Sequence, residues 1–100
     1  MAVRTLIREK MGKPTKQGIL FTLEAPFARS VSMAGTFNDW DPAEQPMKKD
    51  RNGHWTTQLF LKAGTYEYKF VVDGAWQEDP RATSYSQNPF GTRNAVVTVR

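Results

Sequence analysis

Hydrophobic and polar side chains alternate along most of the chain from residue 18 onward, which is the period of a β-strand with one buried face. Five stretches carry this pattern: 19–24, 31–35, 55–62, 66–72 and 95–99. Turn-forming pairs separate the stretches, namely Ala25-Pro26, Asp41-Pro42, Asn52-Gly53, Ala63-Gly64, Asp73-Gly74 and Asn88-Pro89. Short strands with turns at this spacing predict an all-β, antiparallel β-sandwich.

Two of these pairs, Asn52-Gly53 and Asp73-Gly74, are strong hairpin signals because tight hairpin turns need residues with positive φ. The second turn is expected to fold Trp76 back beside the strand that contains Lys69. Lys69 and Val71 alternate with the residues that we assign to the core, which are Tyr66, Tyr68, Phe70 and Val72. Trp55 lies within a strand and is also expected in the core.

Composition places the chain among ordinary globular proteins. One hundred residues correspond to one domain, and 39% of them are hydrophobic. The chain has no cysteine, which excludes a disulfide framework and thiolate metal sites. No apolar run approaches the ~20 residues of a membrane span, and no signal-peptide stretch is seen. We therefore expect a cytoplasmic protein with no membrane partner.

The net charge of +4 comes from one end of the chain. Residues 1–16, here called the N-terminal arm, hold five basic residues and one acidic residue, whereas residues 17–100 hold nine of each. A nucleic-acid-binding protein needs a continuous basic face, so this distribution argues against a nucleic-acid partner. Val3, Leu6 and Ile7 have helical spacing, and Gly12 and Pro14 follow. We expect a short helix or a flexible arm, followed by a β-sandwich domain over 17–100.

The residues needed for catalysis are scarce. His54 is the only histidine, so a histidine metal cluster is not available. The chain has no cysteine, so a cysteine nucleophile is not available either. Glycosidases need two carboxylates on either side of the bound sugar, but Glu78 and Asp79 are adjacent and their side chains diverge. The sequence has no glycine-rich phosphate loop. We predict a protein that is not an enzyme and has no cofactor and no metal.

Two tryptophans, Trp40 and Trp76, each lie beside a turn just past the end of a predicted strand. An indole offers a flat, rigid, apolar face and one N–H donor at its rim. Sugars have apolar C–H faces and polar edges, so exposed indoles are suited to bind them. The alternative interpretation is that both tryptophans cap the edges of the sandwich.

Several motifs resemble carbohydrate-binding module family 48 when they are taken in order. They are TFNDW at 36–40, GTYEYKFVVDGAW at 64–76, DP at 79–80 and GTRNAVV at 91–97. This family includes the glycogen-binding domain of the AMP-activated protein kinase β subunit and the N-terminal domains of isoamylases and branching enzymes. The resemblance covers residues 17–100 and implies an immunoglobulin-like, early-set sandwich that binds α-1,4-glucan.

The resemblance also implies a set of site residues. The two tryptophans that stack on glucose rings in the kinase-type domain match Trp40 and Trp76. A lysine on the preceding strand matches Lys69, and a threonine and an asparagine near the last strand match Thr92 and Asn94. A bulky apolar residue that presses into the curve of the glucan aligns with Phe90, after a loop that differs from the family pattern.

Three functions remain open at this stage. The first is a module that binds glycogen, starch or maltodextrin without catalysis. The second is a protein-interaction domain, associated with an enzyme of glycogen metabolism, that uses the N-terminal arm and Phe60. The third and weakest is nucleic-acid binding through the arm, which would show a steep dependence on salt.

Overall fold

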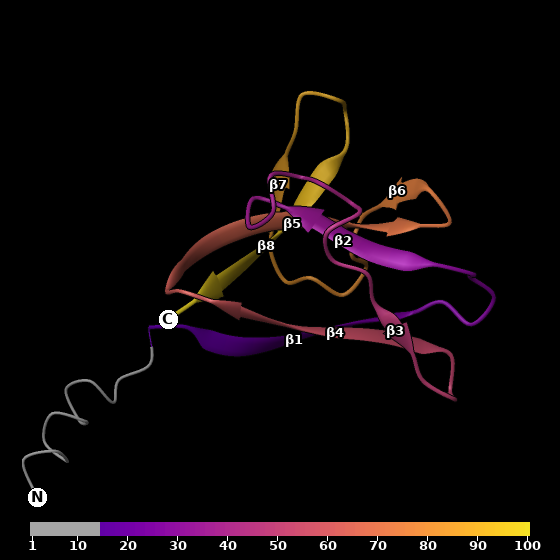
Figure 1. The fold of residues 1–100 in the computed structure, drawn as a ribbon. Helices are drawn as coiled ribbons and strands as arrows, with labels where there is room; N and C mark the ends of the chain where they lie inside the picture. Colours follow the sequence, from indigo (N-terminus) through magenta and orange to yellow (C-terminus); the bar gives the residue numbers. More distant parts are fainter. Residues whose placement is uncertain (1–14) are drawn as a thin grey trace, which may run out of the picture.

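A computed structural model describes residues 15–100, which form eight β-strands and no helix (Figure 1). The strands are β1 (Gln17–Glu24), β2 (Val31–Gly35), β3 (Lys48–Lys49), β4 (His54–Leu61), β5 (Gly64–Val72), β6 (Ala75–Gln77), β7 (Tyr85–Gln87) and β8 (Arg93–Val99). All pairings between them are antiparallel. The N-terminal arm lies almost entirely outside the described residues, so its helix or flexible state and the domain division at 16/17 stay predictions.

The strands form two sheets that face each other (Figure 1). One sheet has the order β1-β4-β3, and the other has the order β2-β5-β8-β7, with β6 paired to β5. The predicted all-β antiparallel sandwich is therefore confirmed. The alternation did not predict β3, β6 and β7, because strands of two or three residues are too short to show a period. For β6, the Asp73-Gly74 turn alone predicted that Trp76 returns beside β5.

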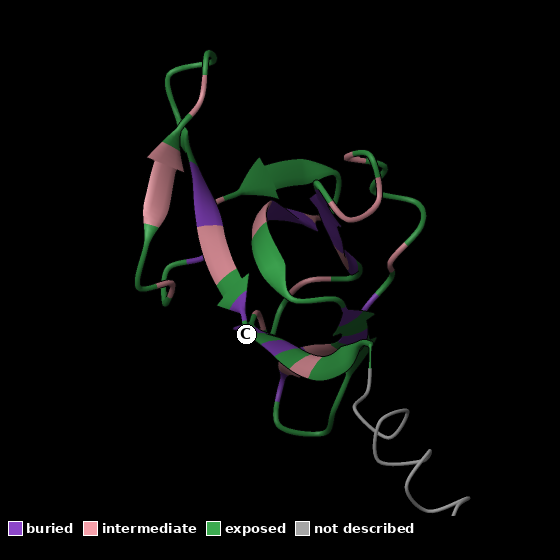
Figure 2. Cartoon of the chain, turned by 90° about the vertical axis from the view of Figure 1, so that its left-hand side faces the viewer, coloured by how far each residue is buried: buried purple, intermediate pink, exposed green. Residues whose placement is uncertain are grey.

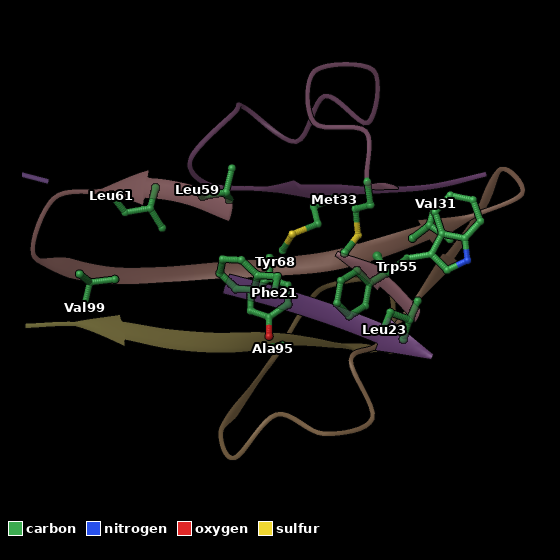
Figure 3. Close-up of a cluster of buried hydrophobic side chains, with 12 residues drawn as sticks. Phe21, Leu23, Val31, Met33, Trp55, Leu59, Leu61, Tyr68, Ala95 and Val99 are labelled. Atoms are coloured by element: carbon green, nitrogen blue, oxygen red, sulfur yellow. The ribbon is translucent and has the colours of Figure 1, made fainter. Parts of the chain in front are cut away.

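The hydrophobic core lies between the two sheets (Figure 3). Tyr68 is central to it, with its ring edge-on to Phe21 at 5.1 Å and to Phe70 at 5.8 Å between centroids. Trp55 is 7% exposed, and its Nε1–H donates to the carbonyl of Ala25 at 2.9 Å. The predicted core position of Trp55 is thus confirmed, and its polar N–H has a partner, as a buried indole requires.

Both faces of β5 are buried along its second half (Figure 2). Tyr68 and Phe70 are buried on the inner face as predicted, and Tyr66 and Val72 are partly buried against the same core. On the outer face, Lys69 is 7% exposed and Val71 is 8% exposed. The alternation correctly placed Lys69 and Val71 on the face opposite the core, but it did not predict that this face is buried.

Both predicted hairpins are present, with different turns. Asp73 and Gly74 have φ of 49° and 84°, which is the two-residue turn with positive φ at both positions. At the other hairpin only Gly53 has positive φ, at 83°, and the backbone N–H of Asp50 donates to the carbonyl of His54. The Asp50 carboxylate accepts hydrogen bonds from the N–H groups of Asn52 and His54, which stabilises this longer turn and lowers the pKa of Asp50.

Candidate functional site

Along one edge of β5, the neighbouring strand changes from β8 to β6 at Lys69. The candidate site lies at this position. Residues 64–68 of β5 pair with β8, where Tyr68 is opposite Ala95. Residues 70–72 pair with β6, where Val71 is opposite Trp76. Lys69 is the one residue between the two ladders. Because side chains alternate across a strand, Lys69, Trp76 and Asn94 all lie on the outer face of the sheet.

A groove of about 650 Å³ opens over this position. It is lined by Trp40, Lys69, Trp76, Asn88, Pro89, Phe90, Thr92 and Asn94. The residues come from the loop after β2, from β5 and β6, from the loop between β7 and β8, and from the start of β8. That last loop projects beyond the sheet (Figures 1 and 2). Phe90 at its tip is 87% exposed and Trp76 is 48% exposed.

A strained turn holds Trp40 at the groove. Asp39 and Trp40 have φ of 55° and 60°, a region that bulky L-residues rarely adopt. The N–H of Trp40 donates to the carbonyl of Gly35 at 2.9 Å. The Asn38 side chain accepts from the N–H of Gly35 and donates to the carbonyl of Met33. Two consecutive residues in this conformation cost free energy, and such strain concentrates at functional sites.

The β5–β6 hairpin holds Trp76 on the other side. Its turn residue Asp73 uses one carboxylate oxygen to accept from the N–H groups of Arg29 at 2.8 Å and Ser30 at 2.9 Å. These two hydrogen bonds lower the pKa of Asp73. The loop between β1 and β2 therefore anchors the hairpin, in which Trp76 is the cross-strand partner of Val71 on the outer face.

The floor of the groove is polar and connected. The Lys69 ammonium donates to the Thr92 hydroxyl at 2.7 Å. The side-chain amide of Asn88 donates to the Thr92 hydroxyl at 2.8 Å and to the Asn94 side-chain oxygen at 2.9 Å. The Asn94 amide in turn donates to the Glu67 carboxylate at 3.0 Å. Among the described residues, no buried side-chain nitrogen or oxygen is left without a partner.

An ion pair fixes the start of β8 next to this floor. Glu78 accepts from the Arg93 guanidinium at 2.9 Å and from the Arg93 backbone N–H at 3.0 Å. The hydrogen bonds from Arg93 lower the pKa of Glu78. The guanidinium also lies 4.0 Å from the centre of the Tyr85 ring. Glu78 therefore holds the backbone that carries Thr92 and Asn94 on either side of Arg93.

The structure brings together all six residues that the sequence predicted for the site: Trp40, Lys69, Trp76, Phe90, Thr92 and Asn94. Their contacts with a sugar stay a prediction. Sequence reasoning missed Asn88 and Pro89, which also line the groove, and the supporting carboxylates of Glu67 and Glu78. The Asn88-Pro89 pair was recognised only as a turn signal.

The groove offers little for catalysis. Its eight lining residues include neither aspartate nor glutamate. Glu78 forms an ion pair with Arg93. Asp79 is buried and accepts a hydrogen bond from the Tyr68 hydroxyl at 2.5 Å. No three potential metal ligands cluster anywhere within residues 15–100. In the same part of the chain, no helix is long and apolar enough to span a membrane.

The sequence profile of one protein family matches residues 21–100. This family is described as the glycogen recognition site of AMP-activated protein kinase. The chain belongs to this family. The family is a carbohydrate-binding module of the family 48 type and is not catalytic. The resemblance seen in the motifs is confirmed, and so is membership of a family that binds carbohydrate.

Individual relatives agree with this assignment. The protein FLOURY ENDOSPERM 6, chloroplastic, of Oryza sativa subsp. japonica is 36% identical over 72 residues, which cover 72% of this chain and 13% of that protein. The AMP-activated protein kinase subunit beta-1 of Sus scrofa is 32% identical over 72 residues, or 72% of this chain and 56% of the subunit.

A third relative is a 1,4-alpha-glucan branching enzyme, GlgB, of Prochlorococcus marinus strain NATL1A. It is 48% identical over 62 residues, which are 58% of this chain and 8% of the enzyme. The chain thus spans from under a tenth to just over half the length of these three relatives. The similarity concerns one module of each, and the activities of the whole relatives do not follow for this chain.

Proposed function

We propose that this chain binds α-1,4-glucan non-catalytically, with the Trp40 and Trp76 indoles stacked on glucose rings. One observation carries the proposal: two indoles and an exposed phenylalanine flank a single groove whose floor bears a lysine, a threonine and an asparagine. Indoles stack on sugar rings at small entropic cost because a tryptophan side chain has only two rotatable bonds. Lys69, Thr92 and Asn94 provide hydrogen bonds to sugar hydroxyls.

The groove is open, so a bound glucan keeps part of its surface in water. We expect an affinity of roughly micromolar to millimolar, about −8 to −4 kcal/mol. Glycogen or starch carries many chain ends, and multivalent attachment would raise the retention of any oligomer or tethered form. We propose that the module localises itself, or a protein associated with it, to a storage glucan, and we keep the cytoplasm as the proposed location.

Titration with maltoheptaose, followed by tryptophan fluorescence and calorimetry, tests the proposal. The wild type should show a saturable response, and Trp40→Ala and Trp76→Ala should each lose it. Phe27→Ala is the matched control, because Phe27 is 95% exposed and does not line the groove. A cello-oligosaccharide of similar length tests the linkage. If glycogen retains the double Trp40→Ala, Trp76→Ala variant as well as the wild type, the site is assigned wrongly.

A second candidate function is recognition of a protein, such as an enzyme of glycogen metabolism. Two exposed hydrophobic side chains favour this function: Leu20 on β1 is 65% exposed, and Phe60 on β4 is 61% exposed. Both lie near Gln17, where the N-terminal arm joins β1. Deleting residues 1–16 should then abolish partner capture and spare maltoheptaose binding. Unchanged capture by the shortened chain would contradict this candidate.

A further inference from the structure

Asn88 lines the groove, yet its hydrogen-bonding capacity is already used. A side-chain amide has two N–H donors and two acceptor sites on its oxygen. Both donors of Asn88 are taken, one by Thr92 Oγ1 and one by Asn94 Oδ1. The amide oxygen accepts from the backbone N–H of Phe90 at 2.9 Å and of Thr92 at 3.2 Å. A residue in this state has nothing left to offer a ligand.

The direction of each hydrogen bond in this network is fixed by groups that cannot reverse. Backbone N–H groups only donate, so the Asn88 oxygen must face them and its NH₂ must face Thr92 and Asn94. Lys69 only donates, and the Glu67 carboxylate only accepts. The Thr92 oxygen therefore accepts twice, from Lys69 and from Asn88. Its own proton is the only part of the hydroxyl that remains for a ligand.

The same amide also supports Phe90. The phenylalanine ring is 87% exposed, so packing contributes little to its position. Gly91 follows with φ of 83°. The backbone N–H of Asn88 donates to the backbone carbonyl of Thr92 at 3.0 Å, and this hydrogen bond closes the loop at its base. The two backbone bonds to the Asn88 oxygen lie inside this closed loop. They fix the peptide that carries the Phe90 ring.

We propose that Asn88 is a positioning residue of the groove, which places Phe90 and commits the Thr92 hydroxyl to donate to the ligand. The inference rests on the proposed glucan binding, and it assigns to Asn88 an action through these two neighbours rather than through the sugar. Pro89 assists, because its fixed φ narrows the conformations of the loop before any ligand arrives.

Amide hydrogen exchange in the free protein tests the positioning directly. Asn88→Ala removes the acceptor, so exchange at the Phe90 and Thr92 amides should speed up by about tenfold or more. Asn88→Asp keeps an oxygen in the same place, so exchange there should stay within about twofold of the wild type. Asn52→Ala, in the β3–β4 turn, is the matched control. Unchanged exchange in Asn88→Ala overturns the proposal.

Maltoheptaose binding tests whether Asn88 acts through its neighbours. In the wild-type background, Asn88→Ala should weaken binding by about tenfold. In a Phe90→Ala, Thr92→Val background the same substitution should change binding by less than about twofold, because its two targets are already gone. An equal loss in both backgrounds would overturn the proposal, because the effect of Asn88 would then not pass through Phe90 and Thr92.

Failure of the inference and failure of the proposed function give different results. If the wild type binds maltoheptaose and Asn88→Ala binds equally well, the inference is overturned and glucan binding stands. If the folded wild type does not respond to millimolar maltoheptaose, the proposed function is overturned and the role of Asn88 in binding falls with it.

Discussion

The Lys69 ammonium lies 2.7 Å from the hydroxyl oxygen of Thr92, and this contact joins the middle of β5 to the end of the β7–β8 loop. Lys69 is 7% exposed, whereas a lysine on the outer face of a sheet usually extends into water. Along β5, Lys69 lies between the β8 and β6 ladders, and its side chain lines the groove. An ammonium has three donors, of which Thr92 takes one, so two remain for the glucan that we propose as the ligand.

We expect Lys69→Met to weaken maltoheptaose binding by about tenfold, roughly 1.4 kcal/mol, because it removes the donors and keeps most of the side-chain volume. Isothermal calorimetry measures the change. Lys62→Met is the matched control, since Lys62 is exposed in the β4–β5 turn and does not line the groove. Equal affinity of the wild type and Lys69→Met would show that Lys69 acts only as a structural residue.

Phe90→Ala should separate binding from stability. The ring is 87% exposed, so its removal should change the free energy of unfolding by no more than about 0.5 kcal/mol. Affinity for maltoheptaose should fall by about fivefold to tenfold as apolar contact with the sugar is lost. Urea unfolding and calorimetry on the same preparations give both numbers. A destabilised variant would indicate that Phe90 packs within the fold.

The sequence was sufficient for the strands whose side chains alternate and for the residues that gather at the groove. Trp55 and Tyr68 follow the period of two and are buried as that period requires. Trp76 reaches the groove because the Asp73-Gly74 turn adopts the positive φ values that these residues favour. Both results depend on local rules, which a single sequence displays.

Contacts between segments distant in the chain were not predictable in the same way. The burial of Lys69 depends on Thr92 at the end of the β7–β8 loop and on the other residues that line the groove, and alternation within β5 carries no information about them. The role of Asn88 depends on four hydrogen bonds that form only after its loop closes beside Asn94 and Thr92. Its amide is ordinary in the sequence, where Asn88-Pro89 indicates only a turn.

Tyr68→Phe should destabilise the fold because it removes one of the two hydrogen-bond donors to the buried Asp79 carboxylate, the other being the Arg81 backbone N–H. The Tyr68 hydroxyl donates to Asp79 at 2.5 Å, and both residues are buried. Leaving Asp79 without this donor should cost about 1–3 kcal/mol of unfolding free energy at neutral pH. Urea unfolding of the variant and the wild type measures the cost. A difference below about 0.5 kcal/mol would mean that water replaces the hydroxyl.

Alkaline pH provides a second test of the same residue. Burial raises the pKa of Tyr68 above the usual phenol range, and the hydrogen bond with Asp79 adds to the shift. The neutral phenol is thus favoured in the folded state, and its stabilising contribution is lost as the pH rises above about 10, where the unfolded tyrosine ionises. Wild-type stability should fall across this range more steeply than that of Tyr68→Phe.

Glu78→Gln should change the response to acid. Hydrogen bonds from Arg93 lower the pKa of Glu78, so the folded protein binds this proton less tightly than the unfolded chain. The contribution is therefore complete above the usual glutamate pKa and is lost as the pH falls through the lower folded value. The wild type should be more stable than Glu78→Gln at about pH 6, and the difference should shrink towards about pH 2. Thermal unfolding of both proteins across this pH range measures the difference in stability. A difference that does not change with pH would exclude the Glu78–Arg93 ion pair as its source.

Gly35→Ala should affect both the fold and the groove. A Cβ on Gly35 would collide with the carbonyl oxygen of Glu67, and would lie 2.7 Å from a ring carbon of Phe37 and 2.9 Å from the Cβ of Tyr68. The first and last of these atoms belong to β5 and cannot move without shifting the β2–β5 pairing. We expect a loss of more than about 2 kcal/mol in unfolding free energy.

Gly35 also determines where Trp40 lies, because its carbonyl accepts from the Trp40 N–H. Any Gly35→Ala protein that folds should therefore bind maltoheptaose more weakly, although Gly35 does not line the groove. Gly18→Ala is the matched control: its Cβ would meet only the flexible end of Gln58 and the edge of the Phe60 ring, and both side chains are exposed. Urea unfolding and maltoheptaose titration of both variants measure the two effects. A Gly35→Ala protein as stable as Gly18→Ala would show that β2 and β5 pack less closely here than the structure indicates.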